Sequence, residues 1–266
     1  MTSFLKPTDR IAVIAPHPDD ETLGVGGILY DARQLDIPVS VIFLTSGDGN
    51  RVGTMQWFKR PLPRPKHYQA YATLREAEAR LSLDVLGIQI TNAHFLRFPD
   101  QGLKKILTPK YRQRPYRSRY TKATRSPAGV SFTGTLIAQL LQQTLAQINP
   151  TVLLLPMLED SHADHQAAGK IAIKAAHSLE LPPRKYAYPV HYRLFPKPRG
   201  TDSSLPLDPP KRHPRLDEWI RYPLSPEAIS AKSRAVEQYV SQLQIPLLDT
   251  LMFSLVRTNE LILPLR

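Results

Sequence analysis

The chain of 266 residues contains no cysteine. This absence excludes disulfide bonds, thiolate metal ligands and cysteine nucleophiles, and it is consistent with a reducing compartment. The sequence also lacks an uninterrupted apolar run of about 18 residues, which a transmembrane helix would need, and residues 1–10 have no apolar signal-peptide core. We therefore expect a soluble protein of the cytoplasm, in peripheral contact with a membrane at most.

Acidic residues are scarce compared with basic ones, 23 against 35, so the net charge is +12. Residues 104–125 contain nine basic residues and no acidic one: Lys104, Lys105, Lys110, Arg112, Arg114, Arg117, Arg119, Lys122 and Arg125. Such a block indicates an anionic partner or substrate, or else a solvated loop that only aids solubility. Residues 51–66 and 184–215 are also basic and rich in proline, so we expect long surface loops in all three segments.

Stretches typical of strands alternate with stretches typical of helices along the chain. Apolar runs at 11–16, 38–44 and 151–156 predict buried strands, short strand-like pieces occur at 88–90 and 93–96, and 185–195 alternates as a strand does. Helical periodicity is found at 22–34, 68–86, 131–148, 166–179 and 225–244. This alternation predicts one α/β domain over residues 1–266, with a mostly parallel central sheet flanked by helices.

Polar side chains crowd at the end of the first predicted strand, where His17, Asp19, Asp20 and Glu21 occur together. Three consecutive carboxylates repel one another unless a cation neutralises them. His17 and Asp20 offer a nitrogen and an oxygen that suit zinc, and Asp19 between them remains free for proton transfer. The alternative is that Asp19 and Asp20 only cap the following helix.

A second polar cluster, His162, Asp164 and His165, follows the strand at 151–156. Ligands in open α/β folds gather at the carboxyl ends of the strands, so we expect His165 to join His17 and Asp20. Two histidines and one carboxylate with an open fourth position are typical of a catalytic zinc site, which lowers the pKa of water to about 7. The alternative is again a polar helix start.

The remaining side chains of the two clusters suit acid–base work. Asp19 is placed to take a proton from water and to return it to a leaving group. His162 would donate a hydrogen bond to a forming oxyanion, with Asp164 orienting its ring. Helix capping alone does not account for both clusters in one chain. The set predicts metal-assisted hydrolysis of an amide or an ester.

The residues His-Pro-Asp-Asp-Glu at 17–21 resemble the signature of the LmbE-like, or PIG-L, family of zinc-dependent de-N-acetylases. His-Ala-Asp-His at 162–165 resembles the second motif of that family. Residues 75–87, 98–102 and 232–242 are similar to its arginine-bearing helix, its proline–aspartate turn and its C-terminal helix. The resemblance spans almost the whole chain, but the basic insertion after Gly102 matches nothing in the family pattern.

The resemblance implies a Rossmann-like fold and one zinc ion per chain, with another divalent ion as the alternative. The implied metal ligands are His17, Asp20 and His165. Asp19 would be the general base, His162 the electrophilic or general-acid histidine, and Asp164 its orienting partner. By the same resemblance, Arg75 and Asp100 would contact a sugar substrate.

The implied activity is removal of an N-acetyl group from an N-acetylglucosamine-type amino sugar in a glycoconjugate. The basic loops would favour an anionic or lipid-linked aglycone. A non-enzymatic binder of anionic polymer or nucleic acid is the alternative, but it would not need the two polar clusters, so no nucleic acid is expected. A nucleotide-binding enzyme is disfavoured because the glycines at 24–27 lie within a predicted helix rather than before one. The oligomeric state does not follow from the sequence.

Overall fold

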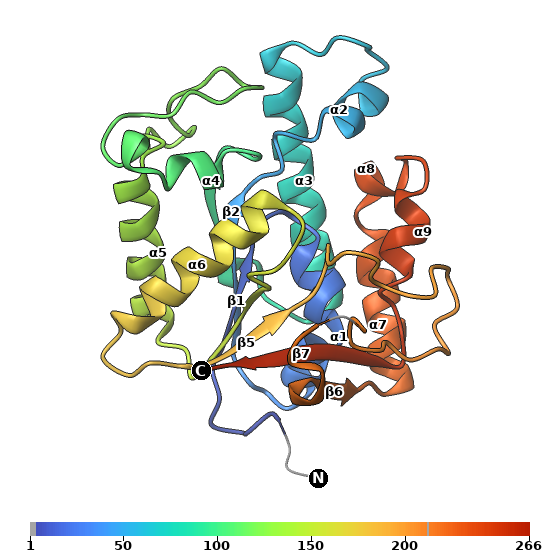
Figure 1. The fold of residues 1–266 in the computed structure, drawn as a ribbon. Coiled ribbons are helices and arrows are strands. Elements are labelled where there is room, and N and C mark those ends of the chain that lie inside the picture. The colour runs from blue at the N-terminus through green and yellow to red at the C-terminus, as the bar shows by residue number, and fades with distance from the viewer. Residues whose placement is uncertain (1–3, 212) are drawn as a thin grey trace.

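A seven-stranded sheet forms the centre of the computed structural model, which describes residues 4–211 and 213–266 (Figure 1). Its strands are β1 (Ile11–Ala15), β2 (Val39–Thr45), β3 (Ala93–Phe98), β4 (Val152–Pro156), β5 (Arg184–Tyr188), β6 (Ile220–Pro223) and β7 (Asn259–Leu265). They lie in the order β3-β2-β1-β4-β5-β7-β6. The first five are parallel and β7 pairs antiparallel with both β5 and β6. The predicted mostly parallel α/β fold is confirmed.

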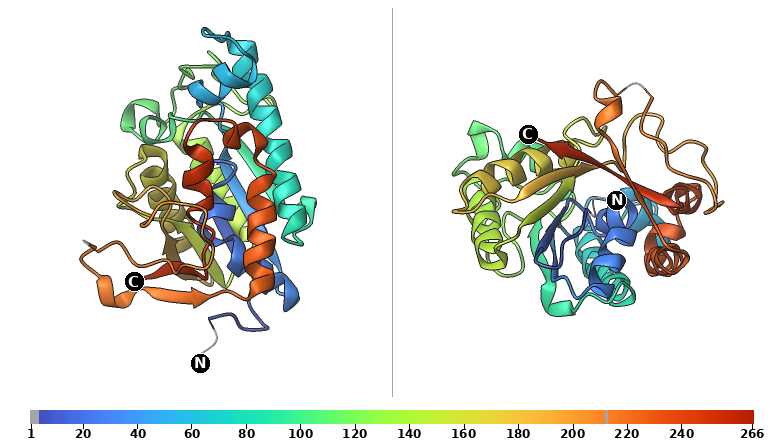
Figure 2. Two further views of the ribbon diagram at one scale, coloured as in Figure 1. Left: turned by 90° about the vertical axis from the view of Figure 1, so that its right-hand side faces the viewer. Right: turned by 90° about the horizontal axis from the view of Figure 1, so that it is seen from below.

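Helices cover both faces of this sheet (Figure 2). They are α1 (Asp20–Gln34), α2 (Arg51–Trp57), α3 (Pro65–Val85), α4 (Leu103–Ile106), α5 (Gly134–Ile148), α6 (Ala163–His177), α7 (Pro226–Glu237), α8 (Val240–Leu243) and α9 (Leu248–Phe253). In the described part of the chain, none of them combines the length and the apolar character needed to cross a bilayer.

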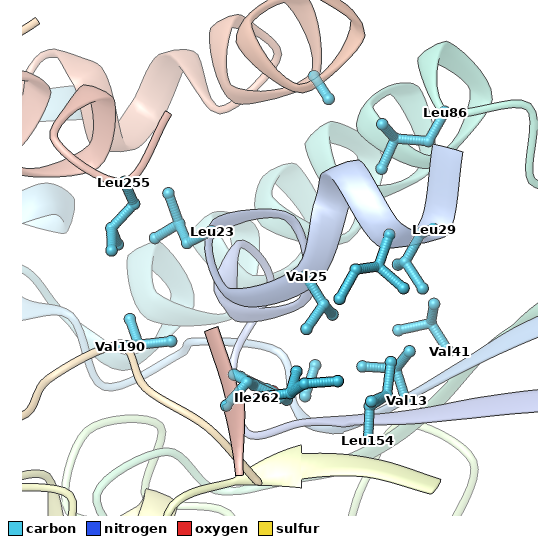
Figure 3. Packing of buried hydrophobic residues seen from close by; sticks show 14 of the residues in the cluster. Val13, Leu23, Val25, Leu29, Val41, Leu86, Leu154, Val190, Leu255 and Ile262 are labelled. Atoms are coloured by element: carbon cyan, nitrogen blue, oxygen red, sulfur yellow. The ribbon is translucent and has the colours of Figure 1, made fainter. Parts of the chain in front are cut away.

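Alternate residues of each central strand belong to different cores. Val13 of β1 packs with residues of α1, α3 and α7, whereas its neighbour Ile14 packs with residues of α5 and α6. Figure 3 shows the first of these cores, in which Val13, Leu29 and Leu154 lie close together. Because helices cover both faces, β1 is buried over its whole length.

Three segments depart from the predicted elements. Residues 51–57, expected within a loop, form α2, because the Asn50 side chain caps the helix by accepting the Gly53 N–H at 2.9 Å. The helix expected at 225–244 is broken at the buried Tyr239 into α7 and α8. The C-terminal strands β6 and β7 were not predicted.

The two predicted basic excursions are only partly irregular. Residues 103–106 form α4 at the start of the first one. Residues 184–188, counted within the second excursion, form β5, in agreement with the alternation seen from residue 185 onward. Arg212, which belongs to the second excursion, and residues 1–3 of the N-terminal segment lie outside the described residues.

Helix α1 is interrupted at Val25, whose φ of −143° is not helical. The two carboxylate oxygens of Glu260 accept the N–H groups of Gly27 and Ile28, both at 2.8 Å. Lys232 donates to the carbonyl of Leu23 at 2.9 Å and pairs with Glu260 at 2.6 Å, with both side chains fully buried. This ion pair satisfies backbone groups that the break leaves without helical partners, and it ties α1 to α7 and β7.

The glycines of α1 serve close packing around this break. A Cβ atom at Gly24 would lie 2.2 Å from the ring of Tyr188, and one at Gly27 would lie 2.5 Å from Leu224. Any larger residue would push α1 away from the sheet. The glycine-rich segment is therefore explained by helix packing.

We expect Glu260→Ala to lower the free energy of unfolding by about 3–5 kcal/mol, because it leaves Lys232 charged, buried and unpaired. Lys232→Met should have a similar effect, because it leaves the buried Glu260 carboxylate without its cationic partner. The Lys232→Met/Glu260→Ala double variant should lose less than the sum of the two single variants. Urea unfolding measures all three. A loss below about 1 kcal/mol for Glu260→Ala would contradict this role of the ion pair.

Candidate active site

The parallel neighbours β1 and β4 deliver their following residues to one place. His17 and Asp20 lie just beyond β1, and His165 lies in the first turn of α6, beyond β4. The Oδ2 atom of Asp20 is 3.1 Å from Nδ1 of His17 and 3.1 Å from Nε2 of His165. All three side chains are buried. The structure thus brings together the three residues expected to bind metal.

The donor atoms of this cluster fit a metal ion. Oδ1 of Asp20 and Oδ2 of Asp164 are buried without a hydrogen-bond partner, and the ring nitrogens of His165 face carboxylates without hydrogen-bond geometry. Donor atoms of His17, His162 and His165 lie within 4.8 Å of one another. Buried polar atoms without partners are rare in proteins. Imidazole and carboxylate donors in such a cluster suit zinc.

The charges within the cluster are strongly coupled. Burial alone would lower the pKa of His165, but the carboxylates of Asp20 and Asp160 raise that pKa to about 9. Burial alone would also lower the pKa of His17, but Asp100 raises this pKa well above its ordinary value. Both imidazoles therefore attract a positive charge, which either a proton or a metal ion can supply. Metal binding here would release protons.

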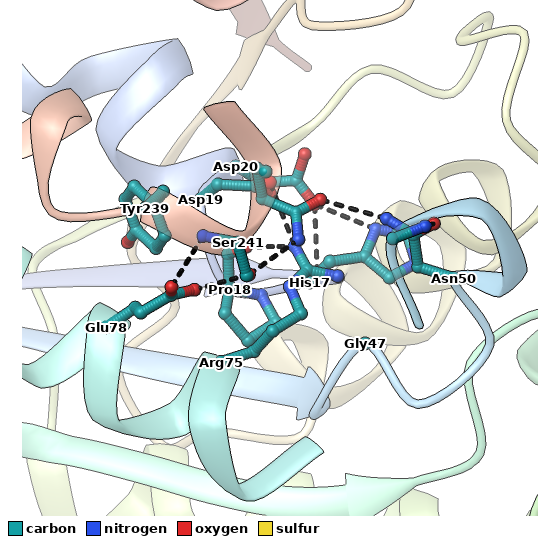
Figure 4. Close-up of polar contacts among 12 residues, drawn as sticks. His17, Pro18, Asp19, Asp20, Gly47, Asn50, Arg75, Glu78, Tyr239 and Ser241 are labelled. Carbon is teal, nitrogen blue, oxygen red and sulfur yellow. Dashed lines mark hydrogen bonds and ion pairs between the residues drawn. The ribbon is translucent and has the colours of Figure 1, made fainter. Parts of the chain in front are cut away.

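Asp19 does not act as a helix cap. It occupies the N-cap position of α1, but its side chain makes no capping hydrogen bond. Its carboxylate accepts from Nη2 of Arg75 at 2.9 Å, and its backbone has a φ of +121° (Figure 4). Burial raises the pKa of Asp19 to about 7, although Arg75 lowers it. A strained backbone and a carboxyl group that can exchange a proton near neutral pH are both typical of catalytic positions.

Arg75 and Asp100, the two residues expected to contact a sugar, are themselves buried. Besides Asp19, Arg75 contacts the carbonyl of Pro18. Asp100 lies 3.0 Å from Nε2 of His17 and accepts the Gly49 N–H at 3.0 Å. In the structure both side chains hold residues of the cluster in place, and their contact with a sugar remains a prediction.

His162 caps α6 and points toward the cluster. Its Nδ1 atom accepts the backbone N–H of Asp164 at 3.3 Å, and its ring meets that of His17 edge-on at 4.8 Å. A neutral His162 would therefore carry its proton on Nε2. The carboxylate of Asp164 accepts the Leu103 N–H at 3.1 Å instead. Asp164 thus orients His162 through its backbone amide rather than through its carboxylate.

Two further residues belong to the site and were missed in the sequence. Asp160 lies 3.1 Å from Nδ1 of His165 and accepts the His162 N–H at 2.7 Å. Nε2 of His191 lies 4.0 Å from Oδ1 of Asp20, and burial, together with His165, lowers the pKa of His191 to about 4. His191 follows β5 just as His17 follows β1, so the position of strand ends was the signal that could have found it.

The comparison with family models identifies residues 12–176 as matching PIG-L: GlcNAc-PI de-N-acetylase. A 1D-myo-inositol 2-acetamido-2-deoxy-alpha-D-glucopyranoside deacetylase of Nocardia farcinica is 25% identical over 170 residues, which cover 63% of this chain and 52% of that protein. The chain thus spans about half the length of that relative. A probable N-acetyl-alpha-D-glucosaminyl L-malate deacetylase 2 of Bacillus anthracis is 20% identical over 90% of this chain and 87% of that protein.

Solved structures share the fold. The zinc-inhibited form of teicoplanin deacetylase Orf2 has a TM-score of 0.65 and 21% identity, over 96% of this chain and 97% of that one. At this identity the likeness shows the fold. Because it covers 96% of this chain, it extends beyond the residues matched by the family model, which end at 176.

We expect Asp160→Asn to weaken zinc binding about 10- to 100-fold, because the carboxylate facing the far nitrogen of a ligating histidine raises its basicity. Zinc titration against a competing chelator measures the change. Asp31→Asn, which alters a half-buried carboxylate bonded to Tyr222, is the matched control and should bind zinc as the wild type does. Equal affinities for Asp160→Asn and the wild type would contradict the assignment of His165 as a ligand.

Proposed function

Because the chain belongs to the PIG-L family of GlcNAc-PI de-N-acetylases, we propose that it is a zinc-dependent hydrolase that removes the N-acetyl group from an N-acetylglucosamine-type amino sugar. The observation that carries this proposal is the placement of Asp20 between His17 and His165, with Asp19 adjacent. Both named relatives are deacetylases of N-acetylated amino-sugar conjugates, which supports the same substrate class here.

The proposed metal ligands are His17, Asp20 and His165. Zinc held there would supply a Lewis acid and a water molecule acidified to a pKa of about 7. Asp19 takes the proton of the attacking water while the water oxygen adds to the acetamide carbonyl. The Nε2–H of His162 donates to the carbonyl oxygen as it becomes anionic. The C–N bond then breaks, Asp19 returns the proton to the leaving nitrogen, and acetate and a free amine are released.

Arg75 and Asp100 support these steps by position. The Arg75 guanidinium fixes the Asp19 carboxylate, and the backbone N–H of Asp19 donates to Glu21 at 3.1 Å. Asp100 fixes the ring of His17. Each reacting side chain is thus held by a buried partner of opposite character, which keeps the geometry ready before the substrate arrives.

A small apolar cavity beside Asp19 fits the methyl end of an acetyl group. Its volume is about 30 Å³, and it also borders His191. The aliphatic side chains that line it are Leu23, Val190, Leu248, Leu251, Met252 and Leu255. A single water-sized group needs about 10–15 Å³, so the cavity has room for two or three such groups. This size accommodates the methyl of an acetyl group and limits how far a longer acyl chain can extend.

The basic segments bear on the aglycone of the substrate. The exposed basic segments support an anionic or lipid-linked conjugate rather than a free sugar. Another divalent ion could replace zinc in the cell, because occupancy follows metal availability as well as affinity.

We expect Asp19→Ala to lower the rate of acetate release about 10²- to 10⁴-fold while zinc content stays near one per chain, because the base is lost and the metal ligands remain. Acetate is measured with a panel of N-acetylglucosamine conjugates that runs from the free sugar to phosphorylated and lipid-linked forms. Asp84→Ala, which removes an exposed carboxylate on α3, is the control. Undiminished acetate release by Asp19→Ala would refute the proposed mechanism.

We expect Met252→Ala to raise kcat/KM for an N-butyryl substrate relative to the N-acetyl substrate by about 10-fold or more, because each added methylene in an apolar pocket contributes about that factor. Leu251→Phe should lower the same ratio by filling the cavity. Parallel kinetics with the two acyl substrates measure it. Ratios that stay equal to the wild type in both variants would show that the acyl group lies elsewhere.

A further inference from the structure

Two segments of the chain contain basic residues and no acidic ones. Residues 51–66 and 104–125 together contain 14 of the 35 basic residues and none of the 23 acidic ones. The remainder of the chain carries 21 basic and 23 acidic residues and is therefore close to neutral. All 14 basic side chains are exposed. Within the described residues, none of them forms a salt bridge.

These two segments form one continuous rim beside the candidate active site. The rings of Tyr68, just after the first segment, and Tyr120, in the second, are 5.1 Å apart. Tyr120 donates to Gln101 at 2.9 Å, and Gln101 donates to the carbonyl of Gly49 at 2.7 Å. The N–H of Gly49 in turn donates to Asp100, which contacts His17. A chain of hydrogen bonds therefore links the rim to the catalytic cluster.

The turn between α8 and α9 extends this rim on the other side. Asn50, at the start of α2, donates to Gln242 of α8 at 3.0 Å. In Figure 1, α2, α4 and α8 all lie toward the upper end of the molecule. We call this surface the basic rim, defined by residues 51–66, 104–125 and 245–248.

The basic rim also carries exposed apolar side chains at its loop tips. Leu247 and Leu62, 82% and 78% exposed, are the two most exposed large apolar residues of the described chain. Val52, 54% exposed, lies on α2 within the same rim. A soluble polyanion would be bound by the cations alone, whereas apolar tips among cations are what a membrane-surface protein inserts below the lipid headgroups.

A cleft of about 680 Å³ opens between α3 and residues 121–127, which overlap the end of the rim. It is lined by the neutral polar side chains of Gln69, Thr73 and Thr121, by the ring of Phe132, and by four charged residues, Asp48, Glu76, Arg97 and Arg125. Hydroxyl and amide groups beside an aromatic ring suit the sugar portion of a glycolipid. The cleft lies next to Asp48, whose carboxylate accepts the Asp100 N–H at 2.8 Å.

We propose that the basic rim docks the chain on an anionic lipid bilayer, with the cations facing the headgroups, Leu62 and Leu247 inserted, and the active site facing the membrane. Resting on the proposed function, this docking implies an amino-sugar substrate that is borne by a lipid. The docking itself does not depend on catalysis, so the two proposals can fail separately.

Co-sedimentation of the full chain with vesicles tests the docking. Vesicles of phosphatidylcholine mixed with phosphatidylglycerol should bind the chain, and vesicles of phosphatidylcholine alone should bind it weakly. Lys105→Gln/Arg112→Gln/Arg114→Gln should lower the partition coefficient on the order of 100-fold, because each cation near an anionic surface contributes roughly a factor of five. The matched control is Lys170→Gln/Lys174→Gln/Arg266→Gln, which removes the same charge elsewhere and should bind nearly as the wild type does.

The leucine variant separates a bilayer from a soluble polyanion. Leu62→Ser/Leu247→Asn should lower vesicle binding at least 10-fold and leave heparin binding unchanged, since heparin offers no apolar layer. Leu35→Ser/Leu181→Ser, at the amino ends of β2 and β5, alters leucines that are 57% and 70% exposed and should change neither. Equal binding of the chain to anionic and neutral vesicles would overturn the docking proposal. Equal vesicle binding by the leucine variant and the wild type would overturn it as well. The second result, with strong heparin binding, would assign the rim to a soluble polyanion.

Discussion

A single buried carboxylate, that of Asp20, determines the geometry of the active site. It touches both His17 and His165, which arrive from different strands, and no other described residue contacts both imidazoles at 3.1 Å. Its position depends on the first turn of α1, and that turn ends at the break beside Val25. The buried pair of Lys232 and Glu260 stabilises this break. The last strand of the chain thus helps to place a residue near its beginning.

The charges of the molecule are arranged in two contrasting ways. Inside the active site several buried charges have a partner of opposite sign, as the pairs Asp19–Arg75 and Asp160–His165 show. On the basic rim the cations have no acidic partner in the described structure. A charge buried in the active site needs a partner, because it has lost its contact with water. A charge on the basic rim is solvated by water or by an external anion. The paired charges of the cluster suit catalysis, and the unpaired cations of the rim suit the anionic surface that we propose as its partner.

Polar residues that follow neighbouring parallel strands converge at one edge of a sheet. This rule was sufficient to predict from the sequence that His17, Asp20 and His165 lie together. It works because β1 and β4 are neighbours and their apolar runs are unambiguous. His191 was missed because the end of β5 is less clearly marked, and Asp160 because its role is to support a ligand. The strands β6 and β7 could not be predicted because their pairing depends on contacts distant in sequence.

The most direct test of the account is a crystal structure of the zinc-loaded protein with anomalous scattering recorded at the zinc absorption edge. We predict one strong anomalous peak per chain, within about 2.0–2.2 Å of donor atoms of His17, Asp20 and His165. His191 and Asp160 should lie outside the coordination sphere. A peak bound by His191 in place of His17, or no peak in protein saturated with zinc, would contradict the central claim.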